Sequence, residues 1–256
     1  MTEARPAHIQ LCGRLVVQLD GRRVEDALPG AKGRLLFAYL VLNRDRRLGR
    51  GELLTAVYGD DVVPSHSASV TVLLSKLRGV IGHQYLQGRS EIELLLPRDA
   101  FVDVEAAREA LHRAESHLAA REWVEAWGPA GVAYHVARRP LLQGEDRPWL
   151  DAWRRRLEDV QLRGLECYVE ARLGLGGPAL VQAEDGARRL IELAPYRETG
   201  YRILMEALEQ RGNVAEALLV YERLRVLLRD ELGATPAPAV QQIHQRLLGA
   251  QPRTSA

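Results

Sequence analysis

Residues 65–90 hold basic and small polar side chains whose chemistry suits a polyanion. No Asp or Glu occurs between Val62 and Ser90, whereas Lys76, Arg78 and Arg89 do. Lysine and arginine donate hydrogen bonds to phosphate oxygens and to the O6 and N7 atoms of guanine. These residue types therefore predict contact with a nucleic acid rather than covalent catalysis.

The first part of this stretch has the spacing of one amphipathic helix over residues 65–81. Its apolar residues recur at i, i+4, i+7 and i+11, the period of a single helix face: Val70, Leu74, Leu77 and Ile81. The opposite face is small, weakly polar or basic: Ser65, Ala68, Val72, Ser75, Lys76 and Gly79. Such a helix fits a DNA major groove. The structural alternative is a helix buried on both sides against a second domain.

Short elements on either side are expected to position this helix. Strands are predicted at residues 9–11, 15–19 and 22–24, and helices at 32–42 and 50–58, with Leu48 as a short extended anchor. After the helix, residues 85–87 and 92–96 predict a β-hairpin with Arg89 at its tip. Three helices followed by such a hairpin indicate a winged helix-turn-helix with an N-terminal β-sheet.

This order of elements resembles the OmpR/PhoB-type winged-helix domain, and residues 70–78 resemble the core of its recognition helix. The resemblance implies DNA contacts at six positions of the helix: Ala68, Val72, Leu73, Ser75, Lys76 and Arg78. Lys76 suits a guanine or a phosphate, and Val72 suits a thymine methyl group. Ser75 suits a base edge or a phosphate oxygen, and Arg78 is expected to hold the DNA backbone. The alternatives are ordinary solvated cations and a valine that packs on the hairpin.

Two cations outside the helix complete the predicted DNA-binding residues. Arg50 opens the second helix, where its amide group and side chain could meet a phosphate. Arg89 could enter a narrow minor groove. Leu73 and Gly79 stand where the resembled domain often has basic residues, so one copy is expected to bind DNA weakly and to need a tandem copy or a protein partner.

The chain from Phe101 onward shows no strand pattern and predicts only helices. Their expected ranges are 104–120, 123–138, 149–174, 179–193, 198–210, 215–232 and 239–248. A bend or split is expected at Gly128-Pro129. The pair at 198–232, turned at Gly212-Asn213, has the length and pattern of a tetratricopeptide-like (TPR-like) repeat, which stacks into a protein-binding solenoid. A compact dimerisation bundle is the alternative.

A longer run carries a second, more specific resemblance. It comprises residues 188–198, Tyr201 and residues 212–218, and it continues through 220–225, 228–233 and 235–238. Together with the preceding domain, this run resembles the SARP/AfsR family, the Streptomyces antibiotic regulatory proteins, whose helical part is a bacterial transcriptional activation domain. The family implies activators that bind direct repeats in promoter DNA and recruit RNA polymerase.

The expected architecture is mainly α with a small β component. A winged helix-turn-helix domain is predicted at 8–100, a TPR-like activation domain at 101–249 and a disordered tail at 250–256. The expected interactions are with double-stranded DNA, RNA polymerase and a further copy of the chain. The alternative function is a TPR-type adaptor or ligand sensor whose winged helix no longer reads DNA.

Composition narrows the remaining classes of function. The net charge is only +1, so any nucleic-acid contact must be a local patch. Cys12 and Cys167 are isolated, which fits a reducing cytoplasm. We find no signal-peptide pattern, no run long enough to span a membrane, no P-loop, no paired metal spacing and no catalytic constellation in the sequence. The expectation is a cytoplasmic protein that is not an enzyme and uses no cofactor, metal or membrane.

Overall fold

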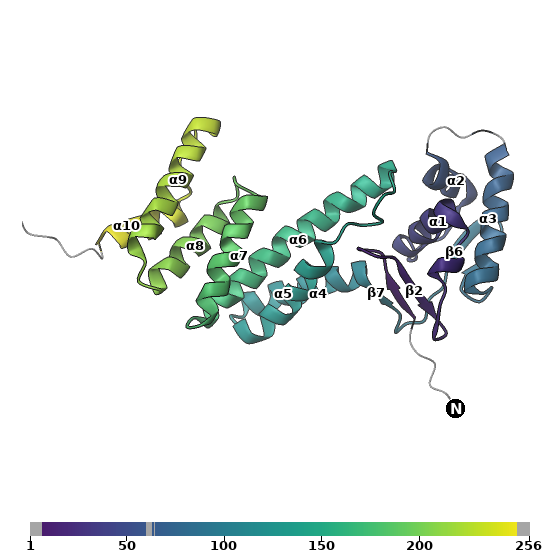
Figure 1. The fold of residues 1–256 in the computed structure, drawn as a ribbon, viewed down its shortest axis with the longest axis horizontal. Coiled ribbons are helices and arrows are strands. Elements are labelled where there is room, and N and C mark those ends of the chain that lie inside the picture. Colours follow the sequence, from purple (N-terminus) through teal and green to yellow (C-terminus); the bar gives the residue numbers. More distant parts are fainter. Residues whose placement is uncertain (1–6, 60–62, 64, 250–256) are drawn as a thin grey trace, which may run out of the picture. The chain divides into compact units, whose positions relative to one another are not determined.

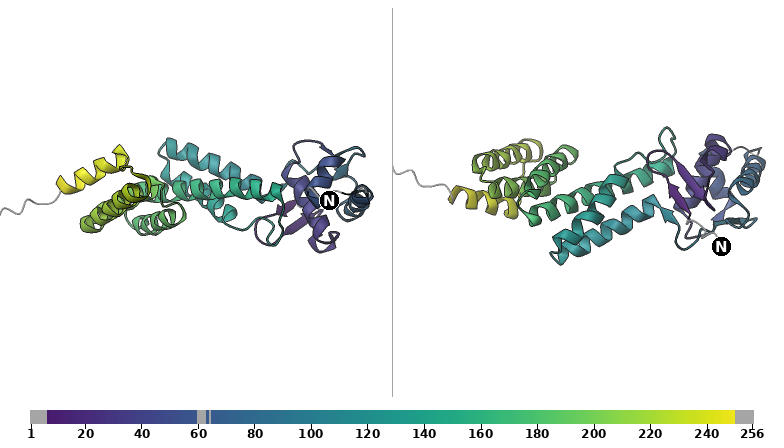
Figure 2. Two further views of the ribbon diagram at one scale, coloured as in Figure 1. Left: turned by 90° about the horizontal axis from the view of Figure 1, so that it is seen from above. Right: turned by 60° about the horizontal axis from the view of Figure 1, so that its bottom comes forward.

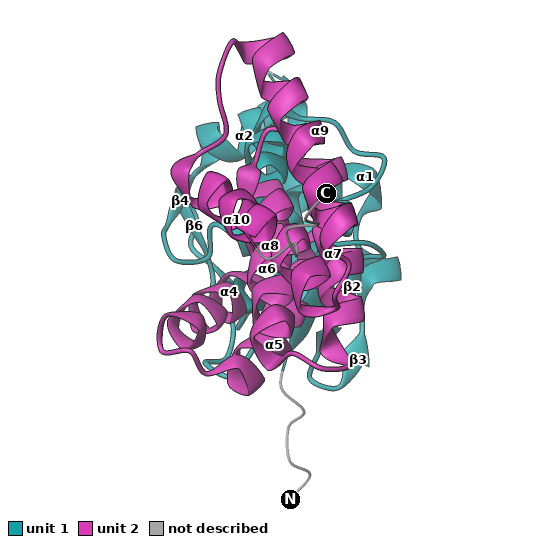
Figure 3. Ribbon diagram, turned by 90° about the vertical axis from the view of Figure 1, so that its left-hand side faces the viewer, with its two compact units in different colours: residues 1–106, 139–157 teal, residues 107–138, 158–256 magenta. Residues whose placement is uncertain are grey.

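The computed structural model describes residues 7–59, 63 and 65–249 of the 256-residue chain, so the predicted tail at 250–256 lies outside the described residues. The described part is mainly helical with a small β component (Figure 1). It forms two compact units, coloured separately in Figure 3. The N-terminal unit comprises residues 1–106 and 139–157 within the described ranges, and the helical unit comprises 107–138 and 158–256.

The N-terminal unit contains a four-stranded sheet in the order β3-β2-β1-β7. Its strands are β1 (His8–Gln10), β2 (Val16–Leu19), β3 (Arg22–Arg23) and β7 (Phe101–Val102). β1 and β2 are antiparallel, with Ile9 opposite Val17 and both residues fully buried. Asp20 and Gly21 both have positive φ at the β2–β3 turn, the conformation that Asp-Gly favours in a tight hairpin turn.

Strand β7 corrects the expectation that no strand follows residue 101. It pairs parallel with β1, and the rings of His8 and Phe101 stack with their centroids 4.6 Å apart. Asp103, directly after β7, accepts hydrogen bonds from the backbone N–H groups of Leu11 and Cys12 at 3.0 and 2.8 Å. Two residues are too few to show an alternating pattern, so this long-range pairing left no local signal.

Three helices pack together in the same unit. After the short 3-10 turn η1 (Glu25–Ala27) they are α1 (Gly30–Leu42), α2 (Arg50–Tyr58) and α3 (Ser65–Ile81). Each contributes a fully buried leucine to their common core: Leu36, Leu53 and Leu74. The predicted helices of this unit are therefore present.

A second, three-stranded sheet lies beside these helices in the order β4-β6-β5. Its strands are β4 (Leu48–Gly49), β5 (Leu86–Gln87) and β6 (Glu91–Leu94). β5 and β6 form an antiparallel hairpin with Leu86 opposite Leu94, and Leu48 of β4 lies opposite Ile92. Leu48 is thus extended, as predicted, and the structure adds that it pairs with the hairpin.

Residues 139–157, expected as a loop and the start of a helix in the second domain, return to the N-terminal unit. Leu141 forms a β-bridge with Cys12. Trp149 Nε1 donates to the carbonyl of Ala56 at 2.9 Å, and Arg147 donates to the carbonyl of Val57 at 3.2 Å. The last carbonyl groups of a helix have no hydrogen-bond donors within that helix, and these two side chains supply donors for α2.

The helical unit and its connections consist of helices (Figure 2). The ends of these helices agree with the predicted ranges to about one residue. They are α4 (Asp103–Ala119), α5 (Trp123–Ala137), α6 (Pro148–Leu175), α7 (Ala179–Leu193), α8 (Glu198–Gln210), α9 (Val214–Leu232) and α10 (Pro238–Gly249). The core joins α6 to α10 through buried residues such as Val169, Leu180, Leu204, Leu224 and Leu247. Within the described ranges, none of these helices has both the length and the apolar character needed to cross a membrane.

Helix α5 runs without a break from Trp123 to Ala137, so of the bend or split expected at Gly128-Pro129 the split is wrong. Pro129 lies inside the helix and lacks the N–H that would bond to the preceding turn. Ala126, Ala130 and Ala133 are fully buried along one side of α5. Their packing holds both halves of the helix on one surface despite the missing hydrogen bond.

Candidate nucleic-acid interface

Helix α3 has the packed face and the exposed face that its periodicity predicts. Val70, Leu74, Leu77 and Ile81 are buried. The predicted outward face is exposed throughout: Ser65, Ala68, Val72, Ser75, Lys76 and Gly79. Val72 is 52% exposed, so it is not buried beneath the hairpin. The result is a helix surface of small side chains with one lysine and no acid.

Lys76 on α3 and Arg89 at the hairpin tip are the two available cations of this surface. Both are exposed, and neither side chain has a hydrogen bond or ion pair with a residue in the described part of the chain. Their charges are therefore free to meet an external anion.

Arg50 is the first residue of α2, as predicted, and its side chain has two partners within the N-terminal unit. Its Nε donates to the backbone carbonyl of Arg89 at 2.5 Å, and a terminal nitrogen donates to Thr71 Oγ1 at 2.7 Å. Thr71 in turn donates to the carbonyl of Ser67 within α3. Arg50 thus ties the start of α2 to both α3 and the hairpin tip.

Arg78 holds the other side of the hairpin loop. Its Nε donates to the carbonyl of Leu86 at 3.1 Å, and its Nη2 donates to the carbonyl of Gly88 at 2.6 Å. Burial, followed by the nearby charge of Arg50, lowers the pKa of Arg78. An arginine remains protonated in spite of such a shift, so the pair adds positive charge beside α3 while it positions the hairpin.

The hairpin turn depends on Gly88. Its φ of +90° lies in the region that favours glycine, and a Cβ atom there would lie 1.8 Å from the carbonyl oxygen of Glu91. Gly88 therefore allows the tight turn that presents Arg89.

Two carboxylates on neighbouring elements are paired, while Glu91 at the start of β6 is exposed. Glu93 of β6 accepts from Arg47 at 3.2 Å. Glu52 of α2 accepts from Tyr39 at 2.6 Å and from Arg46, whose guanidinium lowers the pKa of Glu52. This pairing limits the negative potential near α3.

Among the predicted positions, Leu73 is half-buried at the border between the two faces of α3, while Ala68 and Ser75 are exposed. Leu73 therefore offers only part of its side chain to a ligand. The predicted residues of α3 thus lie on one side of the helix, with Arg89 at the neighbouring hairpin and with Arg50 and Arg78 between the two elements.

Sequence reasoning missed a second group at the N-terminal end of α3. The rings of Tyr58 and His66 stack with centroids 3.9 Å apart, and the ammonium group of Lys32 lies 4.3 Å from the centre of the Tyr58 ring. This group brings a cation from α1 to the first turn of α3. The three residues come from three different helices, so no local spacing could have joined them.

No group of three or more His, Cys, Asp or Glu in the described ranges is placed to hold a metal ion. Cys12 and Cys167 are both buried; burial raises the pKa of Cys12 well above its ordinary value and that of Cys167 to about 12. Neither thiol therefore has the character of a nucleophile.

Comparison with known proteins places this architecture among regulators. The family model described as bacterial transcriptional activator domain matches residues 102–248. The regulatory protein AfsR of Streptomyces griseus is 30% identical over 227 residues, which cover 85% of this chain and 22% of AfsR. The transcriptional regulatory protein EmbR of Mycobacterium tuberculosis (strain ATCC 25618 / H37Rv) is 27% identical over 94% of this chain and 63% of EmbR.

A solved structure has the same fold. It is that of Mycobacterium tuberculosis EmbR in complex with a low affinity phosphopeptide, with a TM-score of 0.82 and 24% identity over 96% of this chain and 66% of that chain. This chain therefore spans only part of the length of these relatives. The family model nevertheless covers more than half of it, so the chain belongs to the SARP/AfsR family of proteins with a bacterial transcriptional activator domain.

Proposed function

We propose that this chain is a transcriptional activator that binds promoter DNA with its N-terminal unit and contacts RNA polymerase with its helical unit. The N-terminal unit acts as a winged helix-turn-helix, in which α3 enters the major groove and the β5–β6 hairpin is the wing. The names of AfsR and EmbR as regulatory proteins support this function. The chain then acts in the cytoplasm, where the bacterial chromosome lies.

The exposed face of α3 is the observation that carries the proposal. A helix must approach base edges closely, and the small side chains of Ala68 and Ser75 leave room for that approach. Any carboxylate on this face would be repelled by the DNA phosphates, and the face has none. An ordinary solvated helix face would have no reason to exclude acidic residues.

The proposed contacts divide by chemistry. Lys76 donates to guanine or a phosphate, Val72 meets a thymine methyl group, and Ser75 meets a base edge or a phosphate. Leu73 adds an apolar edge to this contact. Arg89 at the wing tip enters the minor groove.

Arg50 and Arg78 first position the wing and then offer their remaining N–H groups to the DNA backbone. Each guanidinium has five N–H donors, and two of them are already used in the hydrogen bonds to the hairpin or to α3. The same use of donors is the observation that favours the second candidate function, an adaptor or ligand sensor with a TPR-like helical unit. It leaves Lys76 as the one cation on the exposed face of α3 within the described residues.

DNA binding by the full chain decides between these functions. Fluorescence anisotropy would be measured on labelled duplexes from the region upstream of the gene for this chain, and on a duplex of scrambled sequence, over a series of salt concentrations. A DNA reader prefers the upstream duplex, and the logarithm of its binding constant falls linearly with the logarithm of the salt concentration. The adaptor reading expects equal, weak binding to both duplexes.

A double variant tests the assigned residues. Lys76→Ala with Arg89→Ala removes two phosphate or base contacts, so the salt slope should fall by about two and the affinity should fall with it. Arg22→Ala, an exposed cation on β3 outside α3 and the hairpin, is the matched control and should bind as the unaltered chain does. Equal DNA affinity in the double variant and the control would remove the assignment of the reading face.

A further inference from the structure

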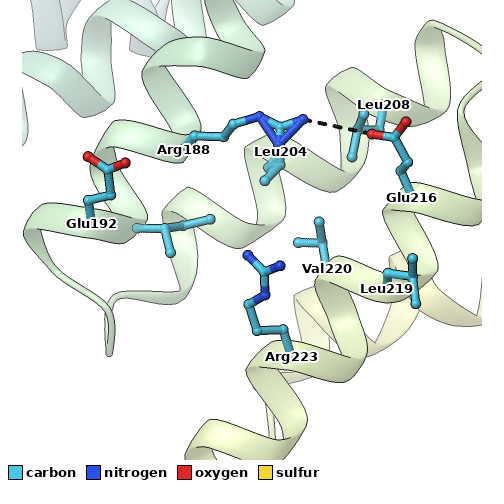
Figure 4. A pocket seen from close by; sticks show the side chains of 9 residues that line it. Arg188, Glu192, Leu204, Leu208, Glu216, Leu219, Val220 and Arg223 are labelled. Carbon is cyan, nitrogen blue, oxygen red and sulfur yellow. Dashed lines mark ion pairs between the residues drawn. The ribbon is translucent and has the colours of Figure 1, made fainter.

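The helical unit has an open groove on the surface formed by α7, α8 and α9 (Figure 4). Its volume is about 370 Å³. We name it the α7–α9 groove, and its main residues are Ile191, Leu204, Leu208, Leu219, Val220 and Arg223. All of them belong to the helical unit, and none takes part in the surface proposed for DNA.

The floor and one wall of the groove are apolar. Leu204 and Leu208, one turn apart on α8, are almost fully buried and form the floor together with Val220. Leu219 on α9 is 69% exposed, the largest exposed fraction among the large apolar side chains of the described residues. Covering this leucine with another apolar group would remove unfavourable contact with water.

The charged residues around the groove leave one charge uncompensated. Arg188 pairs with Glu184 and lies 3.8 Å from Glu216, and Glu192 pairs with Arg189 at 2.8 Å. These pairs neutralise most of the rim.

Arg223 is the exception among the charged residues that line the groove. It has no hydrogen bond or ion pair with any residue of the described ranges, and in Figure 4 its guanidinium extends toward the centre of the groove. Burial raises the pKa of the neighbouring Tyr201, and the positive charge of Arg223 opposes that shift. The groove therefore presents a free cation next to an exposed leucine.

We infer that the α7–α9 groove docks an acidic amphipathic helix of a partner protein. An apolar side chain of that helix covers Leu219, and a carboxylate pairs with Arg223. The two residues are four apart on one face of α9, so their ligand must place an apolar and an acidic group about 6 Å apart, as residues i and i+4 of a helix do. This site is separate from DNA reading by α3 and stands whether or not DNA is bound.

Peptide binding to the full chain tests the inference. The probe is a fluorescein-labelled amphipathic peptide with leucines on one helical face and a glutamate four residues after each leucine. Its comparators carry glutamine or lysine in place of glutamate. Fluorescence anisotropy should show binding of the glutamate peptide about tenfold tighter than that of the glutamine peptide, because a charge-assisted pair with Arg223 is lost. The lysine peptide should not bind.

Matched variants locate the site. Leu219→Ala and Arg223→Gln should each weaken binding of the glutamate peptide about tenfold. Arg223→Gln should also remove the preference for glutamate over glutamine. Leu232→Ala and Arg229→Gln, which change exposed residues of α9 outside the groove, should bind as the unaltered chain does. All four positions are exposed, so circular dichroism should show unchanged helix content and melting.

Three results would overturn the inference. The first is equal binding of the glutamate, glutamine and lysine peptides, or equal binding by groove and control variants. The second is a gain in peptide affinity when residues 250–256 are removed, which would mean that these residues occupy the groove in the full chain. The third is a change from dimer to monomer on Leu219→Ala, measured by light scattering, which would assign it to a second copy.

Discussion

Val72 is an exposed apolar residue on a face of α3 that has no acidic side chain. Val72 contributes little to the core, since half of its surface faces water. It lies between Ala68 and Ser75–Lys76 on a face without acids. A branched apolar group at such a position gains by contact with a thymine methyl group, a contact that an alanine would make with less surface.

Replacing this valine by glutamate tests the proposed contact. Val72→Glu places a carboxylate in the surface proposed to meet DNA, so binding to the upstream duplex should weaken by at least about 2 kcal/mol, roughly thirtyfold. The folded state should change by less than about 0.5 kcal/mol because the position is exposed. Anisotropy gives the affinity and urea unfolding gives the stability.

Val124→Glu is the matched control, since Val124 is an exposed valine on helix α5 of the other unit. It should leave DNA affinity unchanged. If both substitutions had the same effect on DNA binding, α3 would have no special place in recognition.

The exposure of Val72 could be predicted from the sequence, whereas the hydrogen bond of Arg50 could not. The outward position of Val72 follows from the 3.6-residue period of its own helix and needs no tertiary knowledge. The hydrogen bond from Arg50 to the carbonyl of Arg89 joins residues 39 positions apart. Its geometry depends on how α2, α3 and the hairpin pack, so no local pattern in the sequence reveals it.

A small set of hydrogen bonds from side chains to backbone carbonyls holds the hairpin beside α3. Arg50 and Arg78 hold three hairpin carbonyls, those of Leu86, Gly88 and Arg89. Gly88 supplies the turn conformation. The hairpin tip and the exposed face of α3 are consequently presented as one surface.

Gly88→Ala tests this coupling at the element scale. The added methyl group would collide with the carbonyl oxygen of Glu91 at a positive φ, so we expect a loss of about 1–3 kcal/mol in the free energy of unfolding. DNA affinity should fall as well, because Arg89 would be displaced. Urea unfolding and anisotropy measure the two effects separately.

Gly79→Ala provides the contrast on α3. No neighbouring atom lies within 4 Å of a Cβ atom at Gly79, and alanine favours a helix interior over glycine by about 1 kcal/mol. This variant should therefore be at least as stable as the unaltered chain. Equal stability of the Gly88 and Gly79 variants would show that the turn tolerates a side chain.

Elements with strong periodicity were predictable, whereas strand β7 and the continuity of α5 were not. The range of α3 and its buried face follow from four apolar residues at helical spacing. Strand β7 exists because β1 offers it hydrogen-bonding partners, which no local pattern reveals. The continuity of α5 through Pro129 likewise depends on the packing of its buried alanines rather than on propensity.

At the scale of the whole molecule, the N-terminal unit is assembled from two separate parts of the chain. Residues 139–157 contribute the buried Leu141 and Leu142 and the donors Arg147 and Trp149 to it. The predicted domain boundary near residue 100 marks where the sequence pattern changes from mixed strands and helices to helices alone. Periodicity cannot show that residues 139–157 pack on the N-terminal unit after two helices of the other unit. The apolar residues of this loop could pack in the core of either unit.

Substitutions of Trp149 test whether residues 139–157 stabilise the N-terminal unit. Trp149→Ala removes the hydrogen bond to Ala56 and the edge contact with the Tyr39 ring, whose centroid lies 5.0 Å away. We expect a loss of about 2–4 kcal/mol from the N-terminal unit. Trp149→Phe retains an aromatic ring without the indole donor and should lose only about 1 kcal/mol.

Hydrogen exchange on the full chain can assign this loss to one unit. Protection of the α1 and α2 amides should fall in Trp149→Ala, while the amides of α8 keep theirs, because the units have separate cores. Trp123→Ala, which removes a ring packed beside Gly174 in the helical unit, should give the reverse pattern. If Trp149→Ala left α2 protected, the returning segment would only lie on the N-terminal unit without stabilising it, and residues 7–106 would be sufficient to hold α3 in place.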